Sequence, residues 1–155
     1  MTPSSSAAFS SGRYLALRLR PGEYLKESLL HIASKNGLDA ACIVSCVGSL
    51  EEAQLRLAGA DIANKNQVRS FSERLEITSL VGTFGGGESP NCHLHLTVAD
   101  KDGNAFGGHV LDGCKILTTA EVVLLDLTDV IFERRHDPST GFSELAVVKK
   151  ARARL

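Results

Sequence analysis

The sequence predicts an α+β fold with a largely antiparallel β-sheet and one main helix. Two observations lead to this prediction. One segment carries apolar residues at the three- and four-residue steps of a helix, whereas most of the others alternate apolar and polar residues or are short apolar runs. The chain has 155 residues, the length of one domain, and needs neither metal nor disulfide simply to bury a core.

The first two elements are a strand and the helix. Between Tyr14 and Arg20, leucines alternate with other residues as in a half-buried strand, and Pro21-Gly22 ends it. Residues 23–35 carry apolar side chains on one helical face, with an acidic residue in the first turn and a lysine in the last. Asn36-Gly37 supplies the C-terminal stop of this helix.

The rest of the domain is expected to be strands and turns. A hairpin turn is predicted at Asp100 to Gly103, where two alternating segments meet, and a Gly/Pro-rich loop at 85–91. Residues 59–67 are expected to form a polar loop. The further strands are predicted at 41–47, 54–58, 68–71, 75–83, 92–99, 106–111, 120–127, 130–134 and 144–148.

Three regions are expected along the chain. Residues 1–12 are rich in serine and alanine and lack the basic start and apolar stretch of a signal peptide, so we expect a disordered leader. Residues 13–148 form the predicted domain, and 149–155 a basic C-terminal tail. No apolar run approaches the roughly 18–20 residues of a membrane span, so a soluble, cytoplasmic protein without a membrane partner is expected.

Charge and composition argue weakly against a nucleic-acid partner. The net charge is −1, but four of the 17 basic residues lie in the tail, which leaves 13 basic against 18 acidic residues, or −5, in the body. Such a body is a poor match for a phosphate backbone. Aromatic residues make up 5% of the chain and tryptophan is absent, although binding single strands usually relies on aromatic stacking.

The four cysteines indicate neither a disulfide framework nor a structural zinc knot, because no CxxC pair occurs. Cys42 and Cys46 lie in an apolar run and are expected to be small buried hydrophobic residues.

Three of the five histidines form the main candidate site. His93 and His95 are two apart on a predicted strand, so both imidazoles point to one face. If Ala99 opposes Gly103 or Ala105 across the hairpin, His109 opposes His93 or His95 and joins that face; an intermediate register would send His109 to the other face. Three neutral imidazoles with an open position resemble a catalytic zinc site.

Several alternatives remain open at this point. The cluster can instead be a polar strand face with hydrogen-bonded histidines, for example at a subunit interface. Glu88 and Asp112 are the candidates for a fourth ligand or a base, and Glu88 is preferred as the ligand. Cys92 is expected to face away. His31 is expected to be a surface or boundary residue of the helix, and His136 a solvated loop residue. No catalytic residue is assigned.

The ordered motifs resemble a known family. YLALRLRPGE with its helix, AACIVSCVGSL, LEITSLVGTF, HLHLTVADKDGNAFGGHV and TTAEVVLLDL follow the order and spacing of the plants-and-prokaryotes-conserved (PPC) domain, from about Tyr14 to Val148. The chain is similar to its prokaryotic, stand-alone type, because the RGRP core of an AT-hook is absent. The resemblance implies an α+β fold, a homotrimer, a divalent metal such as Zn²⁺ on His93, His95 and His109, and a DNA-binding or regulatory role.

Two other functions compete with DNA binding. One is a metal-dependent, hydrolase-like enzyme, in which a metal-bound water becomes the nucleophile. The other is a small-molecule sensor that uses the same metal site. A weaker resemblance, to the first cupin motif, rests on the spacing of Gly87, His93, His95, Asp100 and Gly107. His109 follows His95 too closely to belong to a second cupin motif, whose proline is also missing.

Overall fold

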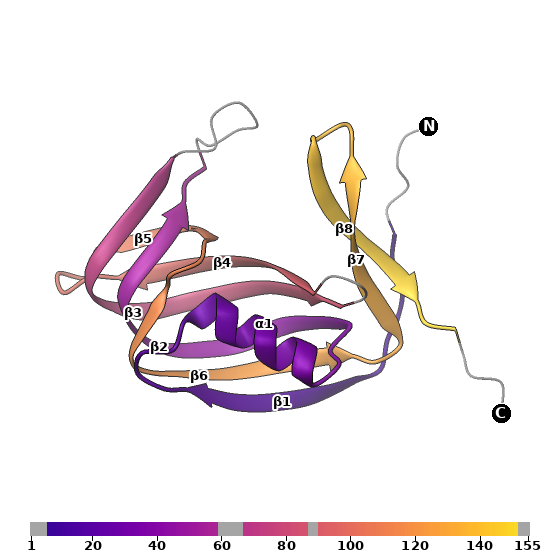
Figure 1. Ribbon diagram of the computed structural model, residues 1–155, viewed down its shortest axis with the longest axis horizontal. Helices are drawn as coiled ribbons and strands as arrows, with labels where there is room; N and C mark the ends of the chain where they lie inside the picture. The colour runs from indigo at the N-terminus through magenta and orange to yellow at the C-terminus, as the bar shows by residue number, and fades with distance from the viewer. Residues whose placement is uncertain (1–5, 59–66, 87–89, 152–155) are drawn as a thin grey trace.

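The computed structural model describes residues 6–58, 67–86 and 90–151 and contains one six-stranded sheet, one helix and a separate two-stranded hairpin (Figure 1). The α+β prediction with an antiparallel sheet is confirmed. The elements are β1 Gly12–Leu19, α1 Leu25–Lys35, β2 Ala40–Arg56, β3 Val68–Gly85, β4 Asn91–Ala99, β5 Ala105–Val110, β6 Lys115–Leu127, β7 Val130–Asp137 and β8 Phe142–Lys149.

The sheet runs in the order β1-β6-β2-β3-β4-β5, with every pairing antiparallel. The end of β2 also pairs with β5, through Leu55 with Val110 and Arg56 with His109. Through this second pairing, strands β2, β3, β4 and β5 form a small closed barrel at one end of the sheet. Leu55 and Val110 are fully buried inside this barrel. Because neighbouring side chains on a strand point to opposite faces, Arg56 and His109 lie on its outside.

The helix covers one face of the sheet. Leu25, Leu29 and Ala33 on α1 are buried, and each fully buried leucine contributes about 1.5–3 kcal/mol through loss of contact with water. The helix starts two residues later than the sequence predicts. The Glu23 carboxylate instead accepts a hydrogen bond from the Arg20 amide in the preceding turn, and Tyr24 forms a bridge to Lys115.

Two pairs of predicted strands are each one long strand. Segments 41–47 and 54–58 are joined in β2, and 68–71 and 75–83 in β3. Gly48 lies between the two predicted segments of β2, and Gly82 lies within the second predicted segment of β3. Both have positive φ and allow a neighbouring backbone to approach more closely than a side chain would permit. A Cβ on Gly82 would lie 2.0 Å from the carbonyl oxygen of His93, so β3 and β4 come together only with glycine there.

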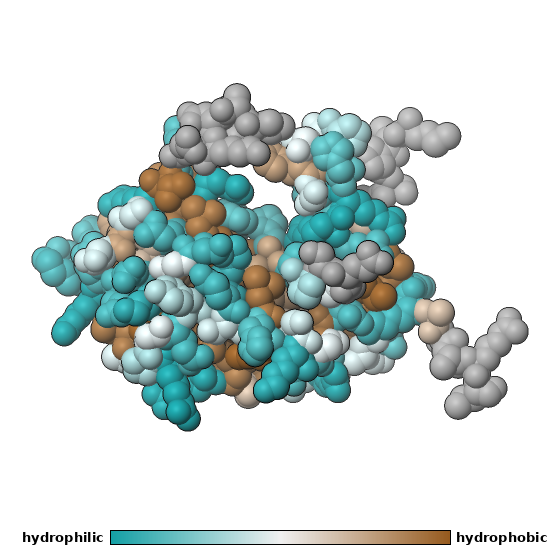
Figure 2. All heavy atoms as spheres, viewed as in Figure 1, coloured by the Kyte–Doolittle hydropathy of each residue, from teal (hydrophilic) through white to brown (hydrophobic). Residues whose placement is uncertain are grey.

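The β7–β8 hairpin stands apart from the sheet on the right of Figure 1. Its base packs against the sheet: Val130 and Phe132 are buried with Ala40 in a small second core. In Figure 2 the surface is hollowed between this hairpin and the end of the molecule where β2 and β3 rise on the left of Figure 1. The hairpin therefore forms one wall over the sheet face that α1 leaves open.

The predicted end regions are partly described. Ser11, within the predicted leader 1–12, donates its backbone N–H to the Asp129 carboxylate. Lys150, in the predicted tail 149–155, forms an ion pair with Asp39 at 2.8 Å. Tail residues Arg152 and Arg154 lie outside the described residues. In the part of the chain that is described, no helix is long and apolar enough to span a bilayer.

Candidate metal centre

The three predicted histidines meet on the open face of the sheet. In the observed register Ala99 pairs with Ala105, so His95 pairs directly with His109, which is one of the two registers that place all three together. His93 and His95 are exposed, while Leu94 and Leu96 between and beyond them are buried on the opposite face. The alternation of β4 therefore assigns its leucines to the core and its imidazoles to the site.

The hairpin that carries the cluster has a well-defined turn. The Asp100 carboxylate accepts hydrogen bonds from the backbone N–H groups of Asp102 and Asn104, both at 2.9 Å. These bonds hold the pKa of Asp100 below its usual value, the side-chain bond from Asn104 contributing most. Asp100 thus shapes the turn, whereas the cupin motif would use it at the metal.

The ring nitrogens converge. Nε2 of His93 lies 3.1 Å from Nε2 of His95, and one nitrogen from each of the three rings lies within 4.8 Å of the others. Two nitrogens bound tetrahedrally to one zinc ion at 2.0–2.1 Å are about 3.3 Å apart. The spacing of the first two rings therefore fits two ligands of a single ion, and the third is within reach of it.

His109 carries a further sign of a ligand site. Its Nδ1 is buried and has no hydrogen-bond partner among the described residues. Buried polar atoms are nearly always satisfied, and those that are not call for an explanation such as an ion. The donor set and this atom together fit a transition-metal ion.

Burial and positive neighbours favour the neutral imidazoles of His93 and His109. Burial, with a smaller contribution from Arg56, lowers the pKa of His109 to about 4. The pKa of His93 is also lowered, first by burial and then by His95 and Arg134. Neutral imidazole is the form that binds metal, so both residues are ready to act as ligands at neutral pH.

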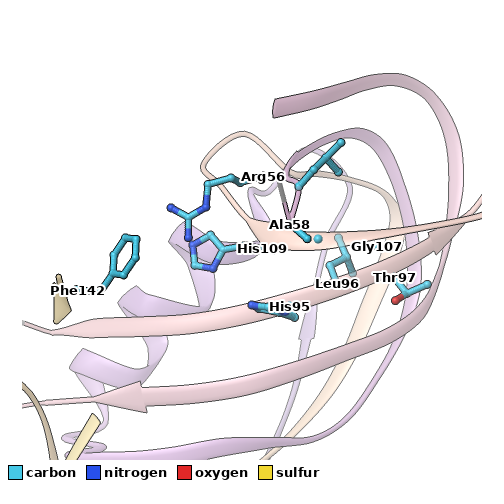
Figure 3. Close-up of a pocket in the computed structure, with 10 residues that line it drawn as sticks. Arg56, Ala58, His95, Leu96, Thr97, Gly107, His109 and Phe142 are labelled. Carbon is cyan, nitrogen blue, oxygen red and sulfur yellow. The ribbon is translucent and has the colours of Figure 1, made fainter. Parts of the chain in front are cut away.

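Two hollows flank the cluster. The first, of about 530 Å³, lies between the end of β2 and the β4–β5 hairpin and is lined by Arg56, His95, His109 and Phe142 (Figure 3). The second, of about 380 Å³, extends toward the β7–β8 hairpin and adds His93, Arg134 and Glu144. The cluster is thus open on both sides to molecules of small size.

The remaining predicted residues lie away from the histidines or outside the described residues. Asp112 forms an ion pair with Lys26 at 2.9 Å. Cys92 pairs with the buried Phe84 and faces away from the histidines, as expected. Glu88 lies outside the described residues.

The other two histidines lie outside the cluster. His31 is exposed on α1. His136 is exposed on β7, where the sequence predicted a loop, because it pairs with Ser143 in the hairpin ladder.

Four residues beside the cluster were missed by the sequence reasoning: Arg56, Arg134, Phe142 and Glu144. Arg56 reaches His109 through the β2–β5 pairing, and the other three come from the last hairpin. None is near the histidines in sequence, so only the long-range topology could have found them.

The fold and the site define an α+β domain with one helix-covered sheet and a three-histidine cluster on its open face. The chain belongs to the Plants and Prokaryotes Conserved (PCC) domain family, whose model matches residues 6–128. This is the family that the motifs resemble, and membership excludes the cupin alternative.

The chain is similar to proteins from bacteria and archaea. Over 141 residues it is 44% identical to the bifunctional protein GlmU of Synechococcus sp. (strain JA-3-3Ab). The matched region covers 91% of this chain and 21% of GlmU. The chain thus spans about a fifth of the length of this relative and of a second Synechococcus GlmU that it also matches.

Two solved structures share its fold over nearly all of their length. A hypothetical protein of Salmonella is 35% identical with a TM-score of 0.85, covering 93% of this chain and 99% of the other. The metal-containing protein AF0104 of Archaeoglobus fulgidus is 28% identical with a TM-score of 0.78, again covering 93% and 99%.

Proposed function

We propose that the protein is a homotrimeric metal-binding domain, in which His93, His95 and His109 hold one divalent ion of the zinc class and leave one coordination position for a small molecule. The convergence of three imidazole nitrogens within 4.8 Å carries this proposal. The similarity to an archaeal protein described as metal-containing supports it. Three nitrogen ligands and an open position suit zinc as a Lewis acid or as a binding point for ligands.

Metal analysis of the purified protein tests the proposal. The wild type is expected to retain close to one zinc ion per chain, and His93→Ala, His95→Ala and His109→Ala are expected to lose it. His31→Ala and His136→Ala are matched controls, because both remove an imidazole outside the cluster. Equal metal content in all six proteins would refute the site.

The open face also supports the trimer. Tyr14, Val47 and Val81 are 71%, 54% and 55% exposed, a large apolar exposure for a folded sheet. Val81 pairs directly with His95, so this apolar surface continues into the histidine cluster. Further copies of the same chain would cover it, and the metal centre would then lie at the border between subunits.

Sedimentation analysis can test the assembly. The wild type is expected to sediment as a trimer, and Val81→Glu to dissociate it, because a carboxylate would be buried without a partner. Ser34→Glu is the control, since it adds the same charge on the exposed side of α1. A wild-type monomer would contradict this part of the proposal.

DNA binding is the second candidate, and the basic segment at residues 149–155 is the observation that favours it. Lys149 is exposed at the end of β8, whereas Asp39 already pairs with Lys150. If DNA is bound, a gel shift should weaken steeply with salt and disappear when 149–155 are deleted. A shift that survives this deletion, or no shift at low salt, would reject the role of the segment.

A further inference from the structure

Two arginines border the histidine cluster without a carboxylate partner. Arg56 and Arg134 form no ion pair within 4 Å with any described residue. By contrast, Arg13 pairs with Asp126 and Arg135 with Glu133. A guanidinium that is partly removed from water is costly unless paired, so the two unpaired charges beside one site need an explanation.

Arg56 is the more isolated of the two. It is half-buried on the last residue of β2, and its side chain shares a face with His109, its partner across the ladder. In Figure 3 its guanidinium lies beside the His109 ring and points toward the hollow that Phe142 faces. The described residues offer it neither a hydrogen bond nor an ion pair, so its donors point to the hollow.

Arg134 approaches from the opposite side. Its Nε donates to Asn91 Oδ1 at 3.2 Å and its Nη2 to Thr83 Oγ1 at 3.3 Å, so neutral groups from β4 and β3 hold it in place. It lines the second hollow together with His93. Its position is therefore fixed, while no carboxylate of the described residues forms an ion pair with it, and further N–H groups remain for another acceptor.

A metal ion would make the charge imbalance larger. Three neutral imidazoles cancel none of the double positive charge of a zinc-class ion, and the two guanidiniums add to it. Among the described residues, Glu144 is the one carboxylate that lines the second hollow, and its Oε1 accepts a hydrogen bond from Thr140 at 2.9 Å. One carboxylate does not balance this charge, whereas an oxyanion at the open coordination position would reduce the imbalance further.

We infer that a free small molecule bearing a carboxylate or phosphate group binds here, with one oxygen on the metal and others on the guanidiniums of Arg56 and Arg134. Guanidiniums bind both groups through paired N–H donors, and the second hollow has room for a small metabolite. This inference rests on the metal centre of the proposed function. It gives the site its ligand class, which is a small oxyanion.

Cobalt-substituted protein gives a direct test, because the visible spectrum of Co²⁺ reports its coordination. Sodium phosphate and sodium acetate are titrated separately at constant ionic strength, and a short DNA duplex forms a third arm. At least one of the two small anions should change the wild-type spectrum saturably, and the anion with the lower Kd identifies the ligand group. Arg56→Gln and Arg134→Gln should raise that Kd at least about tenfold, the loss expected for a charge-assisted hydrogen bond.

Matched variants separate this effect from misfolding. Both glutamine variants should bind as much Co²⁺ as the wild type, Arg56→Lys should recover part of the affinity, and Arg135→Gln should bind anions normally because that arginine pairs with Glu133. Anion affinity that is the same in Arg56→Gln, Arg134→Gln and the wild type would overturn the inference. So would loss of Co²⁺ in Glu144→Gln, which would make Glu144 the fourth ligand.

The three arms also separate failure of the inference from failure of the metal centre. Bound Co²⁺ that ignores both small anions, or responds only to the duplex, overturns the inference and leaves the metal centre standing. A wild type that binds no Co²⁺ overturns both.

Discussion

The two faces of β4 differ in what surrounds them. Leu94, Leu96 and Val98 are almost completely buried under the helix-covered side, whereas His93 and His95 are exposed on the other. One nine-residue strand therefore supplies part of the core and most of the proposed metal ligands. Because neighbouring side chains point in opposite directions, stability and ligand binding can be altered separately.

The largest expected effect is on the buried face. Leu96→Ala should lower the free energy of unfolding by about 2–5 kcal/mol, because it removes a fully buried side chain and leaves a cavity. Denaturant titration measures the loss. Metal bound per folded molecule should stay at the wild-type level; a matching loss of metal would show that the two faces are coupled.

The exposed face should show the opposite pattern. His95→Ala should change the unfolding free energy of the metal-free protein by only about 0.5 kcal/mol or less, as expected at an exposed position. It should also abolish the stabilisation that added Zn²⁺ gives the wild type, about 2.7 kcal/mol at one hundred times the Kd. Thermal unfolding with zinc and with a chelator measures both. Zinc stabilisation that persists in the variant would exclude His95 as a ligand.

Gly82 is the place where the separation of the two faces should fail. An alanine there would put Cβ 2.0 Å from the His93 carbonyl oxygen, so β4 would have to move and take its imidazole along. We expect Gly82→Ala to cost about 1–3 kcal/mol and to weaken metal binding as well. Gly103→Ala is the control, since it has positive φ but an open surrounding. Equal effects of the two variants on metal affinity would contradict the expectation.

The last expected effect is a pH dependence of the metal-free protein. The pKa of His109 is lowered to about 4 in the folded state from about 6.5 unfolded, so the unfolded chain takes up a proton first as pH falls. The contribution of neutral His109 to the free energy of unfolding should thus be fully present above about pH 6.5 and decline between about pH 6.5 and 4. His109→Gln should flatten this decline in denaturant titrations. An identical pH profile in the two proteins would assign the decline to other groups.

Local pattern predicted most of the histidine cluster, whereas long-range pairing determines its surroundings. The alternation around His93 and His95 predicts that these two imidazoles share a face. The short hairpin allows two registers in which His109 joins them, and the observed register is one of these two. The union of two predicted strands into β2 was not predicted. Gly48, between them, indicated a bulge or a close backbone approach, and the structure shows the approach, to Thr119 of β6, inside one continuous strand. Arg56 was missed because its partner on β5 is far away in sequence, and no local pattern connects the two.

The hairpin of β4 and β5 has a consequence for how the protein assembles. His93 and His109 are close in sequence and are joined through a short turn, whereas Gly12 must find Leu127 before β1 joins the sheet. Contacts between nearby residues form early in folding, because closing a short loop costs less entropy. The metal ligands can therefore gather while much of the chain is still unfolded. Arg56 and Arg134 join them only after β2 and the last hairpin have docked, so the metal can be captured before its proposed anion.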